Sequence, residues 1–379
     1  MNWERIVQIP EKYKKRYQKS YILIIVTGIS LITFTTFIII SFPLINLNKL
    51  KHKEYLYLSS EQIETHKVNN FNVQKNNWKD NVIDVATFNY EGKCKNFFQF
   101  KPNNKRDLLV YSFGFFTKGI YMKQRTAALK TLSITRQAIP HAKIVALLLW
   151  PSPTPLLYDD MKKYNVEVVD MSDIPFGHFV VTRYIAFTRY IKRHQSDYDR
   201  VIFSDTRDVV IFNDIFATFG VNDLIWTTEC PFATNSTSNE LSLDFCCSPA
   251  NNHNHFQWLE SFFGDEITRN SVINKQISLN GGFGMGGMKK MIIAMNSFVK
   301  RMRWFPSFFF GYDQALMNVL YYSKEFGVEM KLEGCTQRSC FYGKHLLKLK
   351  NKSVIYSDTG CSPIVVHKLT LTNSDYHMT

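Results

Sequence analysis

The chain has 379 residues, of which 45% are hydrophobic and 21% charged. This length allows one large domain or two small ones, and 31 Phe, 19 Tyr and 6 Trp exclude a wholly disordered chain. Seven Cys are too few for a scaffold built on disulfides. The net charge of +14 divides into +4 over residues 1–20, +5 over residues 46–106 and +5 beyond. Because this charge is not gathered in the expected folded core, we expect no nucleic-acid partner.

The N-terminal part predicts a membrane anchor. No charged residue stands between Tyr21 and Asn48, and about 20 apolar residues are enough to cross a bilayer as a helix. Basic residues precede this stretch, which places the N-terminus in the cytosol. We therefore expect a cytoplasmic tail over residues 1–20, a transmembrane signal anchor over 21–45 and a single-pass type II membrane protein. A cleaved signal peptide is the alternative, disfavoured by the length of the apolar region.

Two regions of different character follow. Residues 46–105 are rich in Asn, Lys, Gln and Glu and indicate a stem. From Arg106 onward, apolar runs alternate with helical patterns. The pattern predicts strands at 108–113, 144–150, 166–169 and 200–204, and helices at 123–138, 156–164 and 183–194. This alternation is typical of an α/β fold with a mostly parallel sheet covered on both faces. Ligands in such sheets bind beyond the carboxyl ends of the strands.

An acidic segment follows one of these strands directly. Asp205-Thr206-Arg207-Asp208 comes after the apolar run 201–204, and a second apolar run resumes at Val209. Two carboxylates at the end of a strand can chelate a hard divalent cation, which neutralises a diphosphate. The alternative is a turn in which Arg207 pairs with the acids.

A glycine-rich segment stands later in the chain. Gly282, Gly284 and Gly287 satisfy the spacing GxGxxG, but no acidic residue follows at the distance that a dinucleotide site requires. We interpret these glycines as positions where the backbone turns or approaches a ligand closely. Asn280, which precedes them, is then available to a substrate hydroxyl.

Two further polar groups are candidates. Asp313 and Gln314 stand where a helix begins, so Asp313 is either a helix N-cap or a general base. His367 ends the last apolar run and is either structural or a third metal ligand beside the two carboxylates. Lys368 follows it and is positioned to contact phosphate.

In this order the motifs resemble a GT-A fold glycosyltransferase, and they are most similar to the glycogenin/galactosyltransferase-like group that uses nucleotide-diphosphate sugars. The resemblance covers residues 106–370 and leaves 371–379 as a C-terminal tail. An anchor and stem before such a domain match transferases of the Golgi or endoplasmic reticulum, with the catalytic domain in the lumen. The resemblance implies a nucleotide-sugar donor and a glycan, protein or lipid acceptor.

The resemblance also implies roles for individual residues. Asp205, Asp208 and His367 would hold Mn2+ or Mg2+. The donor would be bound by Asp205, Arg183, Arg207, Gly281, Gly282 and Lys368. The catalytic and acceptor side would be formed by Asp313, Asn280 and Gln314.

The sequence departs from the family pattern at the metal motif. Asp205 and Asp208 are one residue further apart than in DxD. Either the loop bulges so that both bind the metal, or only one does and Arg207 contacts the diphosphate. The second alternative leaves open a catalytically inactive, membrane-tethered sugar-binding or scaffold protein on the same fold. A nucleotidyltransferase is disfavoured, because such an enzyme rarely needs an anchor and stem.

A few remaining residues carry expectations for a lumenal protein. Cys335 and Cys340 are the expected disulfide pair. The tripeptides at 235–237 and 351–353 are acceptors for N-glycosylation if the domain is lumenal. We expect His253 and His255 in a solvated loop.

Overall fold

The computed structural model describes residues 73, 75–114, 117–150, 154–175, 177–229, 253–335, 338–341, 346–371 and 376–378. These residues all belong to a compact unit, Ser59–Thr379. The predicted tail and anchor, most of the N-terminal half of the predicted stem and the tripeptide at 235–237 lie outside the described residues. Among the described helices, none combines the length and the apolar character needed to span a membrane.

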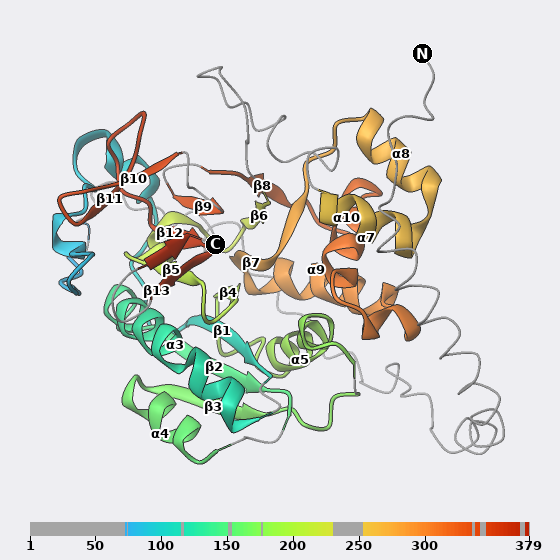
Figure 1. Cartoon of the computed structure of the whole chain (residues 1–379), viewed down its shortest axis with the longest axis horizontal. Helices are drawn as coiled ribbons and strands as arrows, with labels where there is room; N and C mark the ends of the chain where they lie inside the picture. Colours follow the sequence, from blue (N-terminus) through green and yellow to red (C-terminus); the bar gives the residue numbers. More distant parts are fainter. Residues whose placement is uncertain are drawn as a thin grey trace. The chain divides into compact units, whose positions relative to one another are not determined.

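The core of the unit is a seven-stranded sheet, seen near the centre of Figure 1. Its strands run in the order β3-β2-β1-β4-β7-β6-β8, and only β7 runs antiparallel to its neighbours. The bounds are β1 Asp107–Phe113, β2 Lys143–Leu148, β3 Val166–Asp170, β4 Arg200–Ser204, β6 Leu224–Thr228, β7 Leu279–Gly287 and β8 Lys331–Glu333. The predicted mostly parallel sheet is thus confirmed.

Helices cover both faces of the sheet because its strands are apolar on both sides. Along β1, Leu109 and Tyr111 join one core cluster, and Leu108 and Val110 join the other. The first cluster includes side chains of α3 (Lys118–Ala138) and α4 (Leu156–Lys163). The second includes side chains of α5 (Phe179–Arg193), α9 (Met288–Arg301) and α10 (Tyr312–Tyr322). The three helices predicted from the sequence are therefore confirmed.

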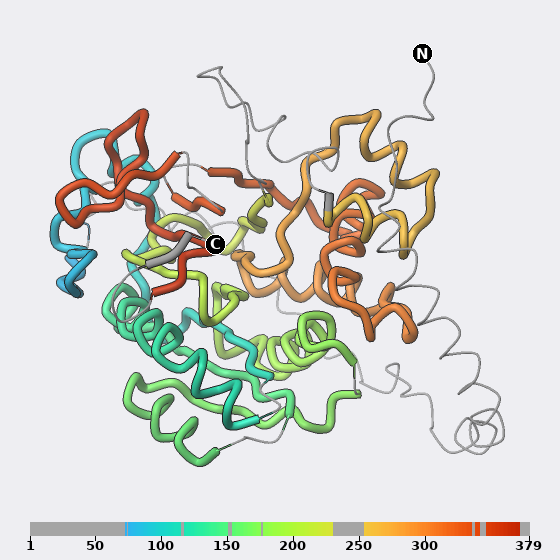
Figure 2. The backbone as a smooth tube through the Cα atoms, viewed as in Figure 1, coloured from blue at the N-terminus to red at the C-terminus, as the bar shows by residue number. Residues whose placement is uncertain are grey.

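Smaller sheets complete the unit. β5 (Val209–Ile211), β12 (Val365–His367) and β9 (Ser339–Phe341) form a three-stranded sheet in which β12 pairs antiparallel to β5 and parallel to β9. Figure 2 shows the yellow-green and red segments of this sheet side by side although they are far apart in sequence. The remaining pairs are β10 (Leu347–Lys350) with β11 (Ser353–Tyr356), and β13 (Leu369–Leu371) with β14 (Tyr376–Met378). β14 lies within the predicted C-terminal tail.

The described part of the predicted stem belongs to the folded unit. Trp78, Ile83, Val85 and Phe88 are buried in the first core cluster. The segment also contains two short 3-10 helices, η3 (Val85–Thr87) and η4 (Gly92–Phe97). These residues therefore extend the folded unit N-terminal to Arg106.

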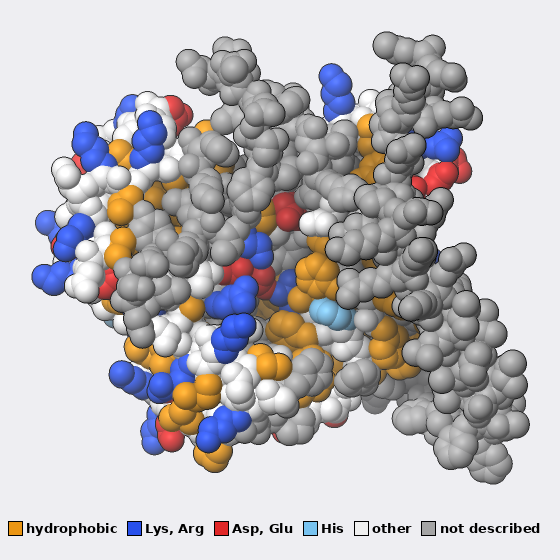
Figure 3. Space-filling model, viewed as in Figure 1, with side chains coloured by type: hydrophobic (Ala, Val, Ile, Leu, Met, Phe, Trp, Pro, Cys, Tyr) orange, Lys and Arg blue, Asp and Glu red, His pale blue; other side chains and the backbone are white. Residues whose placement is uncertain are grey.

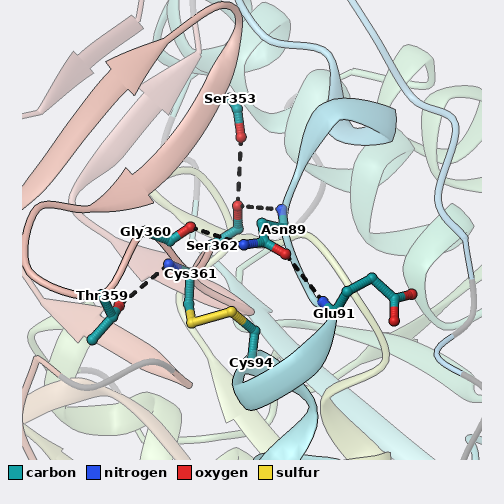
Figure 4. Close-up of a disulfide and its surroundings, with 8 residues drawn as sticks. All are labelled: Asn89, Glu91, Cys94, Ser353, Thr359, Gly360, Cys361 and Ser362. Carbon is teal, nitrogen blue, oxygen red and sulfur yellow. Dashed lines mark hydrogen bonds between the residues drawn. A yellow bond between two sulfur atoms is a disulfide. The ribbon is translucent and has the colours of Figure 1, made fainter.

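A disulfide fixes this segment to the C-terminal part of the chain. Cys94 is bonded to Cys361, and the two Cα atoms are 5.5 Å apart. Figure 4 shows hydrogen bonds beside it, in which the backbone amide of Asn89 donates to the Ser362 hydroxyl at 2.9 Å. The predicted pair Cys335–Cys340 is also a disulfide.

Two neighbouring Arg–Asp pairs lie at the amino ends of β1 and β4, and they differ in burial. Arg200 contacts Asp107 at 2.6 Å, and both side chains are 1% exposed. Arg106 contacts Asp199 at 2.7 Å, with exposed fractions of 49% and 27%. The first pair is part of the core, whereas the second is on the surface.

The expectation that His253 and His255 lie in a solvated loop is wrong. Both belong to helix α7, His253–Phe263, and His255 is fully buried. The helix packs against α10 and against α8 (Asp265–Ile273), so the Asn-His pattern at its start does not mark a loop.

Candidate active site

A cavity of about 400 Å³ opens at the carboxyl ends of β1, β4 and β6. Its wall is completed by the beginnings of β7, α5 and α10. Figure 3 shows acidic and basic side chains gathered near the middle of this face, with hydrophobic side chains beside them. Of the residues predicted for the site, the structure places the following at this cavity: Arg183, Asp205, Arg207, Asp208, Asn280, Gly281, Gly282, Asp313, Gln314 and Lys368.

Asp205, Asp208 and His367 come together beside the cavity. Asp205 follows β4 directly, Asp208 precedes β5, and His367 ends β12 opposite Val209 of β5. Each of the three can contribute one ligand atom so that these atoms all lie within 4.8 Å of one another. Both ring nitrogens of His367 are buried and hydrogen-bond to none of the described residues. His367 Nε2 lies 3.6 Å from Asp205 Oδ2. A buried imidazole whose nitrogens make no hydrogen bond, beside two carboxylates, fits a metal ligand, so this group could bind a metal ion.

The charges around the three ligands keep the carboxylates ionised. Burial would raise the pKa of Asp205, but Arg183, His367 and Lys368 lower it overall. Burial likewise would raise the pKa of Asp208, and the Lys368 ammonium, 3.1 Å from Asp208 Oδ2, lowers it. Burial lowers the pKa of His367, so the neutral ring is favoured. Two anions and a neutral imidazole are the donor set that a divalent cation accepts.

Arg183 connects the candidate metal site of Asp205, Asp208 and His367 to the other side of the cavity. It lies on the first turns of α5 and is 4% exposed. Its guanidinium forms an ion pair with Asp205, donates to the carbonyl oxygen of Gly281 at 2.5 Å and lies 3.6 Å from Asp313 Oδ2. A buried guanidinium with its donors in a fixed fork holds these groups in one arrangement.

Asp313 is the carboxylate on the opposite wall. It stands in the first turn of α10 and is 4% exposed. Burial raises its pKa to about 7, although the nearby Arg183 opposes the shift. Its side chain makes no N-cap hydrogen bond, because the N-cap residue is Gly311. A carboxyl group with a pKa near neutrality is suited to accepting or donating a proton.

The glycine-rich segment is a strand, β7, so the interpretation as a turn is wrong. Close approach of the backbone to a ligand stays a prediction, and the structure shows that side chains of the chain itself pack closely on these glycines. A Cβ atom on Gly282 would lie 2.3 Å from Asp205 Oδ2 and 2.6 Å from His367 Cε1. A Cβ atom on Gly284 would lie 2.2 Å from the indole ring of Trp226. Glycine here leaves room for the metal-binding group and for a buried aromatic ring.

A polar group that sequence reasoning missed lies at the end of β6. Glu229 follows Thr228 and lines the cavity, and the Gln314 amide donates to its carboxylate. Burial raises the pKa of Glu229. Gln314 Oε1 also accepts from the backbone amide of Gly281 at 3.3 Å. The sequence does contain a pattern that indicates Glu229 as a site residue, because Glu229 follows a largely apolar run in the same way as Asp205.

Aromatic side chains form another part of the wall that was not predicted. Phe179, Trp258 and Phe310 line the cavity, and the rings of Trp258 and Phe310 lie 5.3 Å apart. Gly311, at φ +88°, permits this packing, because a Cβ atom there would lie 2.3 Å from the Trp258 ring. No alternation or spacing in the sequence marks these side chains as neighbours.

Comparison with known proteins assigns the chain to no family. No protein-family model matches the chain, and no curated protein sequence matches it.

Proposed function

We propose that the chain is a metal-dependent glycosyltransferase that uses a nucleotide-diphosphate sugar as donor. The observation that carries the proposal is that Asp205, Asp208 and His367 meet at the cavity formed by the carboxyl ends of the strands. That is where α/β sheets bind their ligands. The mostly parallel sheet with one antiparallel strand supports the resemblance to GT-A fold enzymes.

The donor side of the cavity suits a diphosphate. A divalent ion such as Mn2+ or Mg2+, held by Asp205, Asp208 and His367, would neutralise the charge that develops on the leaving nucleoside diphosphate. Lys368 is 31% exposed beside Asp208, and Arg207 is 46% exposed. Both cations are accessible to phosphate oxygens, whereas Arg183 is buried and orients Asp205.

The opposite wall suits an acceptor hydroxyl. Asp313, Glu229, Asn280 and Gln314 place carboxylate and amide groups around one part of the cavity. Asp313, whose pKa burial raises to about 7, can take a proton from a hydroxyl near neutral pH. These residues therefore bind and orient the acceptor, which would be a glycan, a protein or a lipid.

The disulfides support a lumenal location. Cys94–Cys361 and Cys335–Cys340 are bonded, and disulfides persist in the endoplasmic reticulum and along the secretory route rather than in the cytosol. We propose that the folded unit lies in the lumen of the Golgi or endoplasmic reticulum and is tethered there by the predicted anchor.

The direct test is a screen of nucleotide sugars with the purified full chain, measured as release of nucleoside diphosphate with and without Mn2+ or Mg2+. We expect metal-dependent release with at least one donor and its loss in Asp208→Asn. The control is Asp173→Asn, because Asp173 is 72% exposed and outside the cavity. Folded protein that releases no product from any common nucleotide sugar, with either ion, would contradict the proposal.

A further inference from the structure

The segment between α9 and α10 carries aromatic side chains that face solvent. Trp304 is 65% exposed, Phe305 71%, Phe309 45% and Phe310 58%. We call these four residues the aromatic patch. An exposed cluster of large apolar side chains is costly in water and usually marks an interaction surface.

The local structure holds these rings outward. Phe305–Phe308 forms a 3-10 helix, η7, and the rings of Phe305 and Phe309 lie 5.3 Å apart. The Ser307 hydroxyl donates to the carbonyl oxygen of Trp304 at 2.6 Å, and the amide of His178 donates to the carbonyl oxygen of Ser307 at 2.9 Å. The exposure of the patch is therefore built into a hydrogen-bonded segment.

Basic residues accompany the patch. Between Glu266 and Asp313 the sequence contains no acidic residue, and Lys300, Arg301 and Arg303 are exposed immediately before Trp304. Arg301 pairs with Glu325. Lys300 forms no ion pair with any residue in the part of the chain that the structure describes. Aromatic rings beside cationic side chains match the headgroup region of a bilayer, where rings enter the acyl boundary and cations contact phosphates.

We propose that the aromatic patch inserts into the interfacial layer of a membrane, with Lys300 on the lipid phosphates. The predicted anchor ends at residue 45, and about 27 residues separate it from the first described residue. Such a segment spans at most about 100 Å when extended, so the folded unit stays within reach of the bilayer. A second copy is a poorer occupant, because an isologous contact brings these cations toward their own copies.

The patch is continuous with the cavity. Phe310 belongs to the patch and also lines the cavity beside Trp258. Docking of the patch therefore holds the cavity near the membrane surface. One consequence rests on the proposed function. If the chain is a glycosyltransferase, docking of the patch holds its acceptor at the membrane.

The test uses vesicle flotation of the fragment 59–379, because this fragment is a compact unit with both core clusters and lacks the predicted anchor. The vesicles are phosphatidylcholine, alone or mixed equally with phosphatidylglycerol. We expect the fragment to float with the mixed vesicles and less with phosphatidylcholine alone. The double variant Trp304→Ser/Phe305→Ser should bind about 100-fold more weakly, since burying each ring is worth about a factor of ten.

Matched controls distinguish binding through the aromatic patch from nonspecific hydrophobic binding to the vesicles. Tyr158→Ser/Leu349→Ser removes two side chains that are 47% and 40% exposed on α4 and β10, and it should bind like the wild type. Lys300→Glu should weaken binding several-fold, and more so at low salt. Donor hydrolysis in solution should be unchanged in the Trp304/Phe305 variant, so failure of the proposed function and failure of docking are read separately.

Three outcomes would overturn the proposal. The wild-type fragment does not float with mixed vesicles at low salt, the Trp304→Ser/Phe305→Ser variant floats equally well, or light scattering shows a dimer that the same variant dissociates. The third result would assign the patch to a second copy of the chain.

Discussion

Gly282→Ala gives a sharp test of the metal-binding group, because it changes no ligand. The new Cβ atom would lie 2.3 Å from Asp205 Oδ2 and 2.6 Å from His367 Cε1. Favourable contacts between heavy atoms lie at about 3.5–4.0 Å, so each group must retreat by about 1 Å. Ligand distances in metal sites tolerate changes of only about 0.2 Å. We expect the affinity for Mn2+ to fall by about 10- to 100-fold, the range seen when groups supporting a ligand are altered.

The fold should survive this change. Gly282 lies within the extended strand β7, and overpacking typically costs about 1–3 kcal/mol, less than the stability of an ordinary domain. The assay is titration of the full chain with Mn2+, followed by the electron paramagnetic resonance signal of the free ion.

Two other glycines supply the controls for Gly282→Ala. In Gly119→Ala the nearest atom to the new Cβ would be Thr117 Oγ1 at 3.9 Å, so affinity should be unchanged. Gly281→Ala crowds Asp313, at 2.9 Å, and should leave Mn2+ binding nearly intact. Wild-type affinity in folded Gly282→Ala would refute the inference that Asp205 and His367 hold one ion.

Two further predictions concern stability, measured by urea unfolding of metal-free protein. Because the pKa of Asp313 is raised to about 7, the folded chain keeps a proton that the unfolded chain loses above about pH 4. The free energy of unfolding should therefore fall by about 1.4 kcal/mol per pH unit between these values relative to Asp313→Asn, and parallel pH profiles would contradict this. Arg200→Gln should cost about 3–5 kcal/mol, because it leaves a buried carboxylate unpaired. Arg106→Gln, at the exposed pair, should lower the free energy of unfolding by less than about 1 kcal/mol. Equal losses in Arg200→Gln and Arg106→Gln would contradict this prediction.

The sheet and much of the cavity could be predicted because they depend on local patterns. The run 108–113 is hydrophobic except for Ser112 and is buried throughout, as expected for a strand covered on both faces. The carboxyl ends of parallel strands share one edge of the sheet, so Asp205 was predicted at the cavity without knowledge of the contacts. Glu229 follows from the same rule applied to β6.

The features that were missed depend on contacts between distant segments. β7 contains few side chains of high strand propensity, and its glycines are set by Trp226, Asp205 and His367, which pack on it from other strands. The described part of the predicted stem has no clear periodicity, because residues such as Trp78 and Phe88 fill gaps in the core one at a time. From composition alone, such a segment is predicted to be exposed to solvent.

The spacing of Asp205 and Asp208 illustrates how tertiary structure brings together the residues of an ambiguous motif. The extra residue between Asp205 and Asp208 left two alternatives, a bulge that keeps both carboxylates at the site or a site with only one of them. In the structure β4 ends before Asp205 and β5 begins after Asp208, and the residues between them bend. Arg207, 46% exposed, lines the cavity with its guanidinium 3.6 Å from Asp208 Oδ2. The pairing of β5 with β12 sets His367 opposite Val209 and so brings it beside Asp208. The longer spacing is thus accommodated by a bend, and it gives no reason to regard the site as unable to hold a metal.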